Sequence, residues 1–385
     1  MNVLSLFNGM SCGYMALERN NIQVTQYFSS ETDKHANTLS QFIYPNIKQI
    51  GDVCSVFAKD LPKIDLLIGG SPCQGFSFAG KQLNFNDPRS KLFFEFVRIW
   101  REVRSINPDA KFLLENVNMK KEILNAISQE LEVFPVRINS KLVSAQNRDR
   151  WYWTNIKTKK VGLFGDVYSD IPQPKDKGIL LRDILDNGNT VIYDIYNHRP
   201  KRFYSTKGPT LRGERGGLKV TGGAIRGRPN EKGEHIQNLE NNNLEKSNAL
   251  TSVQKDSVLI HVGNADINGH DSIKRVYSDK GKAPCLTGMS GGNQEPKIAI
   301  REKSKTVRSS GRDSYDRHEW DSVDDLHWRK LTVKECARLQ TIPENYIDKM
   351  LESGVSNSQL YKMLGNGWTV DVIAHIFSFL ETRNN

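Results

Sequence analysis

The chain has 385 residues, of which 37% are hydrophobic and 25% are charged, and its formal net charge is +10. This length and composition indicate a folded protein with room for two domains rather than a disordered one, and no apolar run approaches the roughly 20 residues that cross a membrane. The positive charge favours a polyanionic partner such as nucleic acid, although it would equally suit a merely basic globular protein.

The chain begins directly on an apolar stretch, with no basic segment or cleavage site of a signal peptide, so we expect a cytoplasmic protein. Its five cysteines, at positions 12, 54, 73, 285 and 336, form no Cys-x-x-Cys pair, and its eight histidines are scattered. Structural zinc needs closely spaced ligands, and a disulfide framework needs paired cysteines. We therefore expect no metal and no disulfides.

The first elements predict a Rossmann-like α/β unit. Residues 3–7 are typical of a strand, residues 8–13 of a turn built from small residues, and the segment from Tyr14 of a helix. The turn places its glycines as Gly9-x-x-x-Gly13, not as Gly-x-Gly-x-x-Gly. This spacing disfavours a pyrophosphate at the helix N-terminus, and with it a nicotinamide-dependent oxidoreductase.

Carboxylates follow the next two predicted strands. Glu31 lies just past a strand at residues 24–28, and Asp52 ends a third strand candidate. A carboxylate at the first position can accept hydrogen bonds from both ribose hydroxyls, and one at the second from an adenine amino group. A surface acid is usually only solvated, but two acids at successive strand ends describe an adenosine site without phosphates, which suits S-adenosylmethionine.

A strand at residues 64–68 leads into the loop that carries Cys73. Gly69 and Gly70 end the strand, and Pro72 makes the next turn rigid. The thiol is therefore expected at the carboxyl edge of the sheet, where open α/β folds bind ligands, and its thiolate would be a strong nucleophile. A single cysteine is more often a small buried hydrophobe, so this residue alone does not establish catalysis.

Further charged side chains are expected at the same edge. After a helix at residues 91–103, a strand at residues 110–117 runs into Glu115. Arg148 and Arg150 then precede an aromatic strand. Arginines two residues apart on a strand share a face, which fits a paired binding site but also a solvated edge strand.

The composition changes at about residue 155. Residues 155–328 are rich in Gly, Asn, Lys and Arg and contain two similar segments, 202–211 and 275–286. We interpret these segments as equivalent pieces of a small, β- and loop-rich domain. The most polar stretch, residues 226–246, is expected to be a loop.

Regular α/β character returns near the C-terminus. A capping box at residues 332–335 opens one helix, and a Gly-rich turn at residues 364–370 opens an apolar helix at residues 370–380. An apolar helix needs a core to bury it, so we assign it to the first domain. The sequence thus predicts an α/β domain of residues 1–154 plus 329–385, interrupted by a smaller domain of residues 155–328.

Several blocks resemble, in order, the motifs of the bacterial and phage DNA (cytosine-5) methyltransferases, and they cover residues 1–154 and 329–380. The chain departs from the common family pattern at Ser5, at Cys12 and in the sequence Gly367-Trp368 after Asn366. The matching blocks are residues 7–13 (first cofactor motif), Pro72-Cys73-Gln74-Gly75-Phe76-Ser77 (nucleophile loop), Glu115-Asn116-Val117, Gln146-x-Arg148-x-Arg150 (paired arginines), residues 329–343 (the motif that closes the recognition domain) and Gly365-Asn366 (last cofactor motif).

The resemblance implies an S-adenosylmethionine-dependent methyltransferase with a Rossmann-like core, an inserted target recognition domain and S-adenosylhomocysteine as a product. It implies attack of Cys73 on carbon-6 of a flipped-out cytosine, with Glu115 on ring N3, and Arg148 and Arg150 on O2. The cofactor contacts expected from it are Phe7, Asn8, Gly9, Met10, Glu31, Asp52, Val53, Pro72, Leu92, Asn366 and Trp368. The DNA contacts expected are Gln74, Ser77, Arg212, Arg215, Arg226 and Arg228.

The implied partner is double-stranded DNA, bound by a monomer in the cytoplasm of a bacterial or phage-infected cell, with a separate restriction endonuclease as a candidate companion. Two alternatives remain at this stage. Methylation of RNA is one, although the large basic insert favours duplex DNA. A non-catalytic DNA-binding regulator is the other, and the presence of Cys73, Glu115 and Arg148 together argues against it. The recognised DNA sequence is left open.

Overall fold

The computed structural model describes residues 1–71, 91–162, 165–186, 193–194, 223–229, 235–241, 259, 261–265, 267–288, 294–301 and 326–380. The nucleophile loop expected at residues 72–77 therefore lies outside the described residues, as do Arg212 and Arg215.

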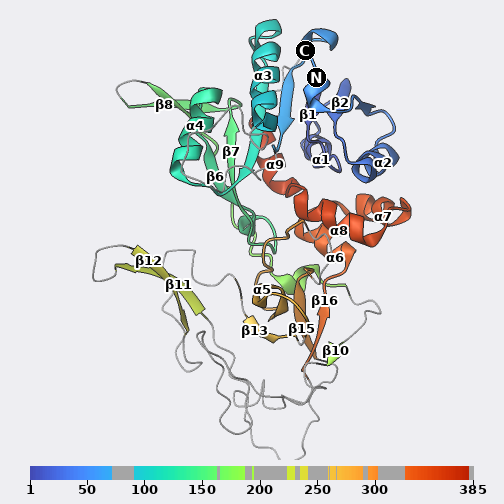
Figure 1. The fold of residues 1–385 in the computed structure, drawn as a ribbon, viewed down its shortest axis with the longest axis vertical. Coiled ribbons are helices and arrows are strands. Elements are labelled where there is room, and N and C mark those ends of the chain that lie inside the picture. Colours follow the sequence, from blue (N-terminus) through green and yellow to red (C-terminus); the bar gives the residue numbers. More distant parts are fainter. Residues whose placement is uncertain are drawn as a thin grey trace, which may run out of the picture.

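A seven-stranded sheet forms the centre of the larger part of the molecule, with strand order β3-β2-β1-β4-β5-β7-β6 (Figure 1). The first five strands in this order are mutually parallel, and β7 runs antiparallel to both of its neighbours. The strands are β1 (Asn2–Leu6), β2 (Gln26–Ser30), β3 (Lys48–Gln49), β4 (Leu66–Gly69), β5 (Lys111–Val117), β6 (Val136–Asn139) and β7 (Asp149–Thr154).

The strand order reverses at β1, which lies between β2 and β4. In open α/β sheets such a switch point opens a crevice at the carboxyl ends of the two central strands, because the connections leave in opposite directions. The turn after β1 and the carboxyl end of β4 therefore border the expected ligand site.

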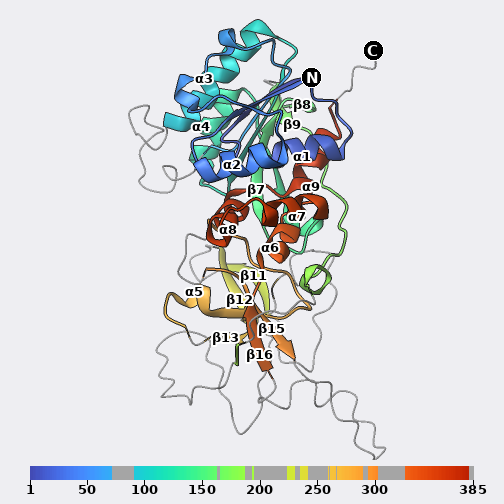
Figure 2. The ribbon, with the colours of Figure 1, turned by 90° about the vertical axis from the view of Figure 1, so that its right-hand side faces the viewer.

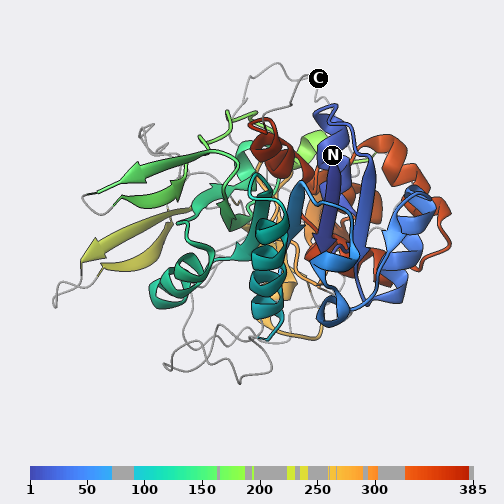
Figure 3. The same ribbon diagram turned by 90° about the horizontal axis from the view of Figure 1, so that it is seen from above.

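Helices cover both faces of this sheet, because its central strands are apolar on both sides. Val3 and Ile68 belong to a buried cluster that includes residues of α1, α2 and α9, whereas Leu4 and Leu67 belong to a second cluster with α3 and α4 (Figure 3). Such two-sided burial is the usual state of parallel strands. The helices are α1 (Cys12–Arg19), α2 (Lys34–Ile43), α3 (Lys91–Ile106), α4 (Lys121–Leu131) and α9 (Val370–Phe377).

Helices α6 (Val333–Leu339), α7 (Glu344–Glu352) and α8 (Asn357–Asn366) lie between the first sheet and a second one (Figure 2). The capping box predicted for α6 is present: Thr332 accepts a hydrogen bond from the Glu335 main-chain N–H, and Glu335 accepts one from that of Thr332. The predicted last helix is α9, and it packs on α1, where the Asn20 amide donates to the Ala374 carbonyl at 2.8 Å.

The second sheet is smaller, with strand order β10-β16-β15-β14-β13. Two hairpins, β8–β9 and β11–β12, and the short helix α5 (Asp271–Lys274) complete this part of the described chain. The strands are β8 (Thr158–Val161), β9 (Asp166–Ser169), β10 (Tyr193–Asp194), β11 (Gly223–Pro229), β12 (His235–Asn241), β13 (His261–Asn264), β14 (Arg275–Tyr277), β15 (Lys297–Arg301) and β16 (Leu326–Lys330).

The prediction of a loop at residues 226–246 was wrong. Strands β11 and β12 form an antiparallel pair there, in which Gly223 is opposite Asn241 and Pro229 is opposite His235. A two-stranded hairpin needs few apolar residues, so the polar composition concealed it. The sequence reasoning also missed α8, whose first turn is polar.

Residues 277–288 are held tightly against the first domain. The buried Lys282 ammonium donates to the carbonyls of Lys141, Ser144 and Ile179, and its burial lowers the pKa of this lysine. Ala283 exchanges main-chain hydrogen bonds with Ala145 and Asn147. Leu286 and Ile298 are buried in the same apolar cluster as α6 and α9. The packing is therefore continuous across the predicted boundaries at residues 155 and 328, and the division of function between the two domains stays a prediction.

None of the helices in the described part of the chain is both long and apolar enough to cross a membrane.

Candidate active site

The turn after β1 has an unusual backbone. Phe7, Gly9 and Ser11 all have positive φ, at 55°, 56° and 65°. Such values are costly for residues with a β-carbon, and they concentrate at ligand sites, where surrounding contacts hold them. Here Asn8 supplies those contacts: its amide donates to Ser11 Oγ at 2.8 Å, and its oxygen accepts from the Tyr27 hydroxyl at 3.0 Å.

Glu31 closes the opposite side of this turn. Its Oε2 accepts the Gly9 main-chain N–H at 2.8 Å, and its Oε1 accepts those of Thr32 and Asp33. A carboxylate has about four acceptor positions, so three N–H donors leave capacity for a hydroxyl. The half-buried Glu31 is thus fixed at the carboxyl end of β2 with one edge available, as a ribose contact requires.

The other residues expected around the cofactor divide into exposed and buried ones. Asp52 is exposed and caps a short 3-10 helix by accepting the Cys54 N–H at 3.0 Å. Val53 is buried and Leu92 half-buried in the apolar cluster of α3, whereas Met10 is buried in the cluster on the other face of the sheet. Asp52 is therefore accessible for a polar contact with a ligand, whereas Met10 packs in the core and supports the turn after β1.

The end of β4 is held by the neighbouring strand. The Asn116 amide on β5 donates to both the carbonyl and the hydroxyl of Ser71, each at 3.3 Å. Ser71 is the last described residue before Pro72 and Cys73. The last described residue before the predicted nucleophile loop is therefore held directly beside the strand that carries Glu115.

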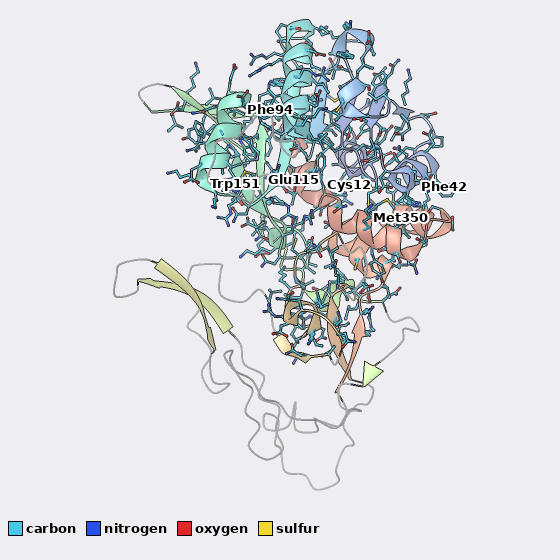
Figure 4. All side chains as sticks on the ribbon, viewed as in Figure 1. Cys12, Phe42, Phe94, Glu115, Trp151 and Met350 are labelled. Carbon is cyan, nitrogen blue, oxygen red and sulfur yellow. The ribbon has the colours of Figure 1, made fainter. Side chains whose placement is uncertain are left out.

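Glu115 and Arg150 form the polar centre of this edge. The Arg150 Nε lies 2.9 Å from Glu115 Oε1, and both side chains are largely buried. Burial by itself lowers the pKa of Arg150, but the Glu115 carboxylate beside it raises that pKa above its ordinary value. The register of β5 and β7 explains why these two side chains are close. Val117 pairs with Arg150 and Glu115 with Tyr152, so Glu115 and Arg150 are diagonal neighbours on the same face of the sheet. Glu115 is labelled in Figure 4, between the labels of Trp151 and Cys12 in that view.

Arg148 has a different environment from Arg150, although the two were expected to act together. Its guanidinium donates to the carbonyls of Leu286, Gly365 and Gly367 at 3.1, 3.1 and 2.9 Å, and the side chain is buried. These carbonyls come from the segment between β14 and β15, from the last turn of α8 and from the residue that follows α8. Arg148 is thus placed to hold three segments together, whereas Arg150 is placed beside Glu115.

The turn after α8 brings the last two expected cofactor residues to the site. Asn366 is exposed, and the half-buried Trp368 donates its indole N–H to Glu115 Oε2 at 3.2 Å. Cys12 packs beneath this turn, where its burial raises the pKa of the thiol to about 11. Trp368 therefore contacts the predicted base-binding carboxylate, a contact that the sequence did not predict.

Cys285 is a second residue that the sequence reasoning missed. Its Sγ lies 3.6 Å from Arg148 Nη1 and 3.7 Å from Arg150 Nη2. The only sequence signal was its position in the repeated segment 275–286. Of the expected DNA contacts, Arg226 and Arg228 lie in β11, and Gln74, Ser77, Arg212 and Arg215 lie outside the described residues.

Comparisons with known proteins agree with this architecture. The family described as C-5 cytosine-specific DNA methylase matches residues 1–381. The orphan methyltransferase M.Rho11sI of Bacillus phage rho11s is 27% identical over 99% of this chain and 97% of its own length. The type II methyltransferase M1.ScrFI of Lactococcus lactis subsp. cremoris is 29% identical over 91% of this chain and 70% of its own. The solved structure of S. pombe Dnmt2 methyltransferase aligns over 99% of this chain and 98% of its own with a TM-score of 0.55 at 16% identity, which shows a shared fold.

Proposed function

The chain belongs to the C-5 cytosine-specific DNA methylase family, and we propose that it methylates carbon-5 of one cytosine within a specific sequence of double-stranded DNA. The observation that supports this most directly is the Glu115–Arg150 pair, 2.9 Å apart at the edge of the sheet. The adjacent Asn116 holds Ser71, from which the chain enters the Pro72-Cys73-Gln74 loop.

The proposed reaction begins with the Cys73 thiolate. Cytosine carbon-5 is a poor nucleophile, so the thiolate first forms a bond to carbon-6, and the electrons of the C5–C6 double bond become available at carbon-5. Glu115, in its protonated form, would donate to ring N3, and Arg150 would donate to O2, so that charge developing on the ring is stabilised. Carbon-5 would then form a bond to the methyl group supplied by the cofactor, and loss of the carbon-5 proton would restore the double bond and expel the Cys73 thiolate.

Arg148 has a supporting part in this proposal. Its guanidinium is engaged by main-chain carbonyls at 2.9–3.1 Å and is buried. A side chain held in this way can keep β7, and with it Arg150, in place. We therefore assign the contact with O2 to Arg150 and a positioning role to Arg148.

The cofactor proposed is S-adenosylmethionine, which would supply the methyl group and leave as S-adenosylhomocysteine. The residues at the switch point fit this molecule: Glu31 has acceptor capacity for a ribose hydroxyl, and Asp52 lies exposed in the segment after β3, where it caps a short 3-10 helix rather than ending the strand. Phe7, Gly9, Val53, Leu92, Asn366 and Trp368 would line the remainder, with Asn8 and Met10 holding the turn.

Access to the cytosine and choice of sequence belong to the rest of the chain. A base within a duplex cannot be reached by Cys73, so it must be flipped out. We propose that residues 155–328 read the DNA sequence, with phosphate contacts for affinity and base-edge contacts for specificity. The enzyme would act as a cytoplasmic monomer, either alone or as the protecting half of a restriction-modification system.

The decisive experiment expresses the chain in cells that lack cytosine methylation and sequences bisulfite-treated DNA. We expect one cytosine of a short recurring sequence to resist conversion by bisulfite. In cells that express Cys73→Ser, the same cytosine should be converted like all others. The purified protein should also transfer methyl groups to duplex DNA and not to tRNA. Methylation of tRNA alone, or retained activity in Cys73→Ser, would refute the proposed function.

A further inference from the structure

The indole of Trp368 lies between the predicted cofactor turn and the predicted base-binding carboxylate. Its N–H donates to Glu115 Oε2 at 3.2 Å, and Arg150 approaches the other oxygen of the same carboxylate. Glu115 is thus engaged on both oxygens by donors from opposite sides. Two such contacts fix the direction in which the carboxyl group points, because a carboxylate held at one oxygen alone can still rotate.

The space around this indole is set by two glycines. A β-carbon on Gly70 would lie 3.0 Å from Trp368 Nε1 and 3.2 Å from Glu115 Oε2. A β-carbon on Gly13 would lie 3.5 Å from the Trp368 ring and far closer, at 2.4 Å, to Ile68. The absence of a side chain at Gly70 therefore lets the indole reach Glu115, because any larger residue would crowd both Trp368 and Glu115.

The backbone on either side of Trp368 is anchored. The Gly367 carbonyl accepts from Arg148 Nη2 at 2.9 Å, and the Gly367 N–H donates to Met363 at 2.7 Å. Thr369 donates its hydroxyl to Gln340 Oε1 at 2.9 Å. A side chain between two fixed residues has little conformational freedom. The position of the indole is therefore set by its own backbone, and its N–H can restrict the movement of Glu115.

We propose that Trp368 is a positioning residue for methyl transfer, which holds the Glu115 carboxyl group in the orientation that meets ring N3 of the flipped cytosine. This role rests on the function proposed above for Glu115. It adds a physical link between the turn that borders the cofactor and the group that binds the base. The indole N–H makes the contact, so a ring without that donor should lose the effect while still filling the space.

Trp368→Phe tests this directly, and Trp151→Phe is its matched control. Trp151 also donates its indole N–H to a side chain, Asn118 Oδ1 at 3.1 Å, but it does not contact Glu115. In Trp368→Phe we expect the single-turnover rate at saturating DNA and cofactor to fall about ten-fold, as for loss of one hydrogen bond. The KM for DNA should change less than about two-fold. Trp151→Phe should keep the wild-type rate.

A double-mutant cycle separates this role from simple packing. Gly70→Ala should lower the single-turnover rate in the wild-type background, and should lower it less in Trp368→Phe, where the crowded Nε1 atom is missing. Equal effects of Gly70→Ala in both backgrounds, or a Trp368→Phe rate within about two-fold of wild type, would overturn the proposal.

One measurement is independent of methyl transfer. In ¹H–¹⁵N spectra the Trp368 indole resonance, identified by its loss in Trp368→Phe, should move in Glu115→Gln, and the Trp151 resonance should not. An unmoved Trp368 resonance overturns the contact even in a fully active enzyme. A moved resonance in a protein that methylates no cytosine would refute the proposed function and leave the Trp368–Glu115 contact standing.

Discussion

Gly365 and Thr287 touch so closely that a β-carbon on residue 365 would lie 1.7 Å from the Thr287 carbonyl oxygen. Thr287 belongs to the segment between β14 and β15 of the second sheet, and Gly365 to the end of α8, next to the predicted cofactor residue Asn366. The same junction receives the guanidinium of Arg148, which donates to the carbonyls of Leu286 and Gly365. A segment of the predicted recognition domain and the predicted cofactor motif are thus packed main chain to main chain, and only glycine at position 365 permits it.

Gly365→Ala should therefore destabilise the protein by about 3 kcal/mol, because the obstructing atoms are main-chain atoms that cannot rotate away. Urea unfolding measures this change. Ser358→Ala, at an exposed position of the same helix, is the control and should change stability by less than about 0.5 kcal/mol. Equal stability of Gly365→Ala and wild type would mean that the two segments separate readily.

Glu31→Ala should weaken cofactor binding by about 1–3 kcal/mol, the cost of losing a hydrogen bond to a charged acceptor. The substitution also releases the Gly9 N–H that Glu31 accepts at 2.8 Å, so the turn after β1 should loosen. Calorimetry with S-adenosylhomocysteine in the absence of DNA measures the effect. Thr32→Ala, at the exposed adjacent position, should bind normally. Unchanged affinity of Glu31→Ala would remove this residue from the site.

Arg148, which lies just before β7, and Arg150, which lies in β7, should differ in their effects. Arg148→Ala leaves three buried carbonyls without their donor and should cost at least about 3 kcal/mol of stability. Arg150→Ala should lower the single-turnover methyl-transfer rate about a hundred-fold, because it removes a group aimed at developing charge, and should cost less stability than Arg148→Ala. Urea unfolding and single-turnover rates, measured on both variants, decide. A larger loss of rate in Arg148→Ala and a larger loss of stability in Arg150→Ala would assign the catalytic role to Arg148 instead.

The sequence could predict which residues gather at the edge of the sheet, but not what each one contacts there. Strand periodicity and the glycines at strand ends predicted Glu31 and Glu115 at the carboxyl ends of β2 and β5, where the structure places them. The expectation that Arg148 and Arg150 share a strand face was wrong, because β7 begins at Asp149 and Arg148 lies just before it. Their separate environments depend on residues 286, 365 and 367, which arrive from distant parts of the chain.

Trp368 shows the same limit. The sequence marked Gly367-Trp368 as a departure from the common family pattern, but the contact with Glu115 joins residues 253 positions apart. No local pattern encodes such a meeting, because it depends on how α8 and α9 are placed against the sheet.

The free energy of unfolding should decrease at acid pH, and protonation of Glu335 should account for part of that decrease. This carboxylate is fully buried, accepts both Nη atoms of Arg329 at 2.6 and 2.7 Å, and also accepts the main-chain N–H groups of Asp186 and Thr332. Burial by itself raises the pKa of Glu335, but these donors outweigh it and lower the pKa below the ordinary value of 4.5. A carboxyl group with a lowered pKa stabilises the fold above its ordinary pKa, and loses that contribution as the pH falls through the lowered value.

Glu335→Gln should therefore cost about 3 kcal/mol at pH 7, because it leaves the buried Arg329 without its counter-charge. The difference in unfolding free energy between wild type and variant should shrink as the pH falls below 4.5. Urea unfolding at a series of pH values measures it. A difference that stays constant down to the acid transition would show that another group is responsible.

The last prediction concerns the basic residues of the second domain. Arg212, Arg215, Arg226 and Arg228 lie in a Gly-rich stretch far along the chain from Glu31, Glu115 and Arg150. If they contact DNA phosphates, neutralising one of them should weaken binding to all duplex sequences and reduce the slope of log affinity against log salt by about one. If one reads a base edge instead, its loss should cost about 1–3 kcal/mol at a single base position.

Cofactor affinity without DNA should stay unchanged in all four variants, because the adenosine contacts proposed here come from the turn after β1 and the ends of the neighbouring strands. DNA affinity measured at several salt concentrations, with cofactor calorimetry in parallel, distinguishes these outcomes. Substitution of Lys59, an exposed lysine of the first domain, controls for the loss of one positive charge and should leave the salt slope as it is. Variants of the second domain that bound DNA normally but lost the cofactor would contradict the division of labour between the domains.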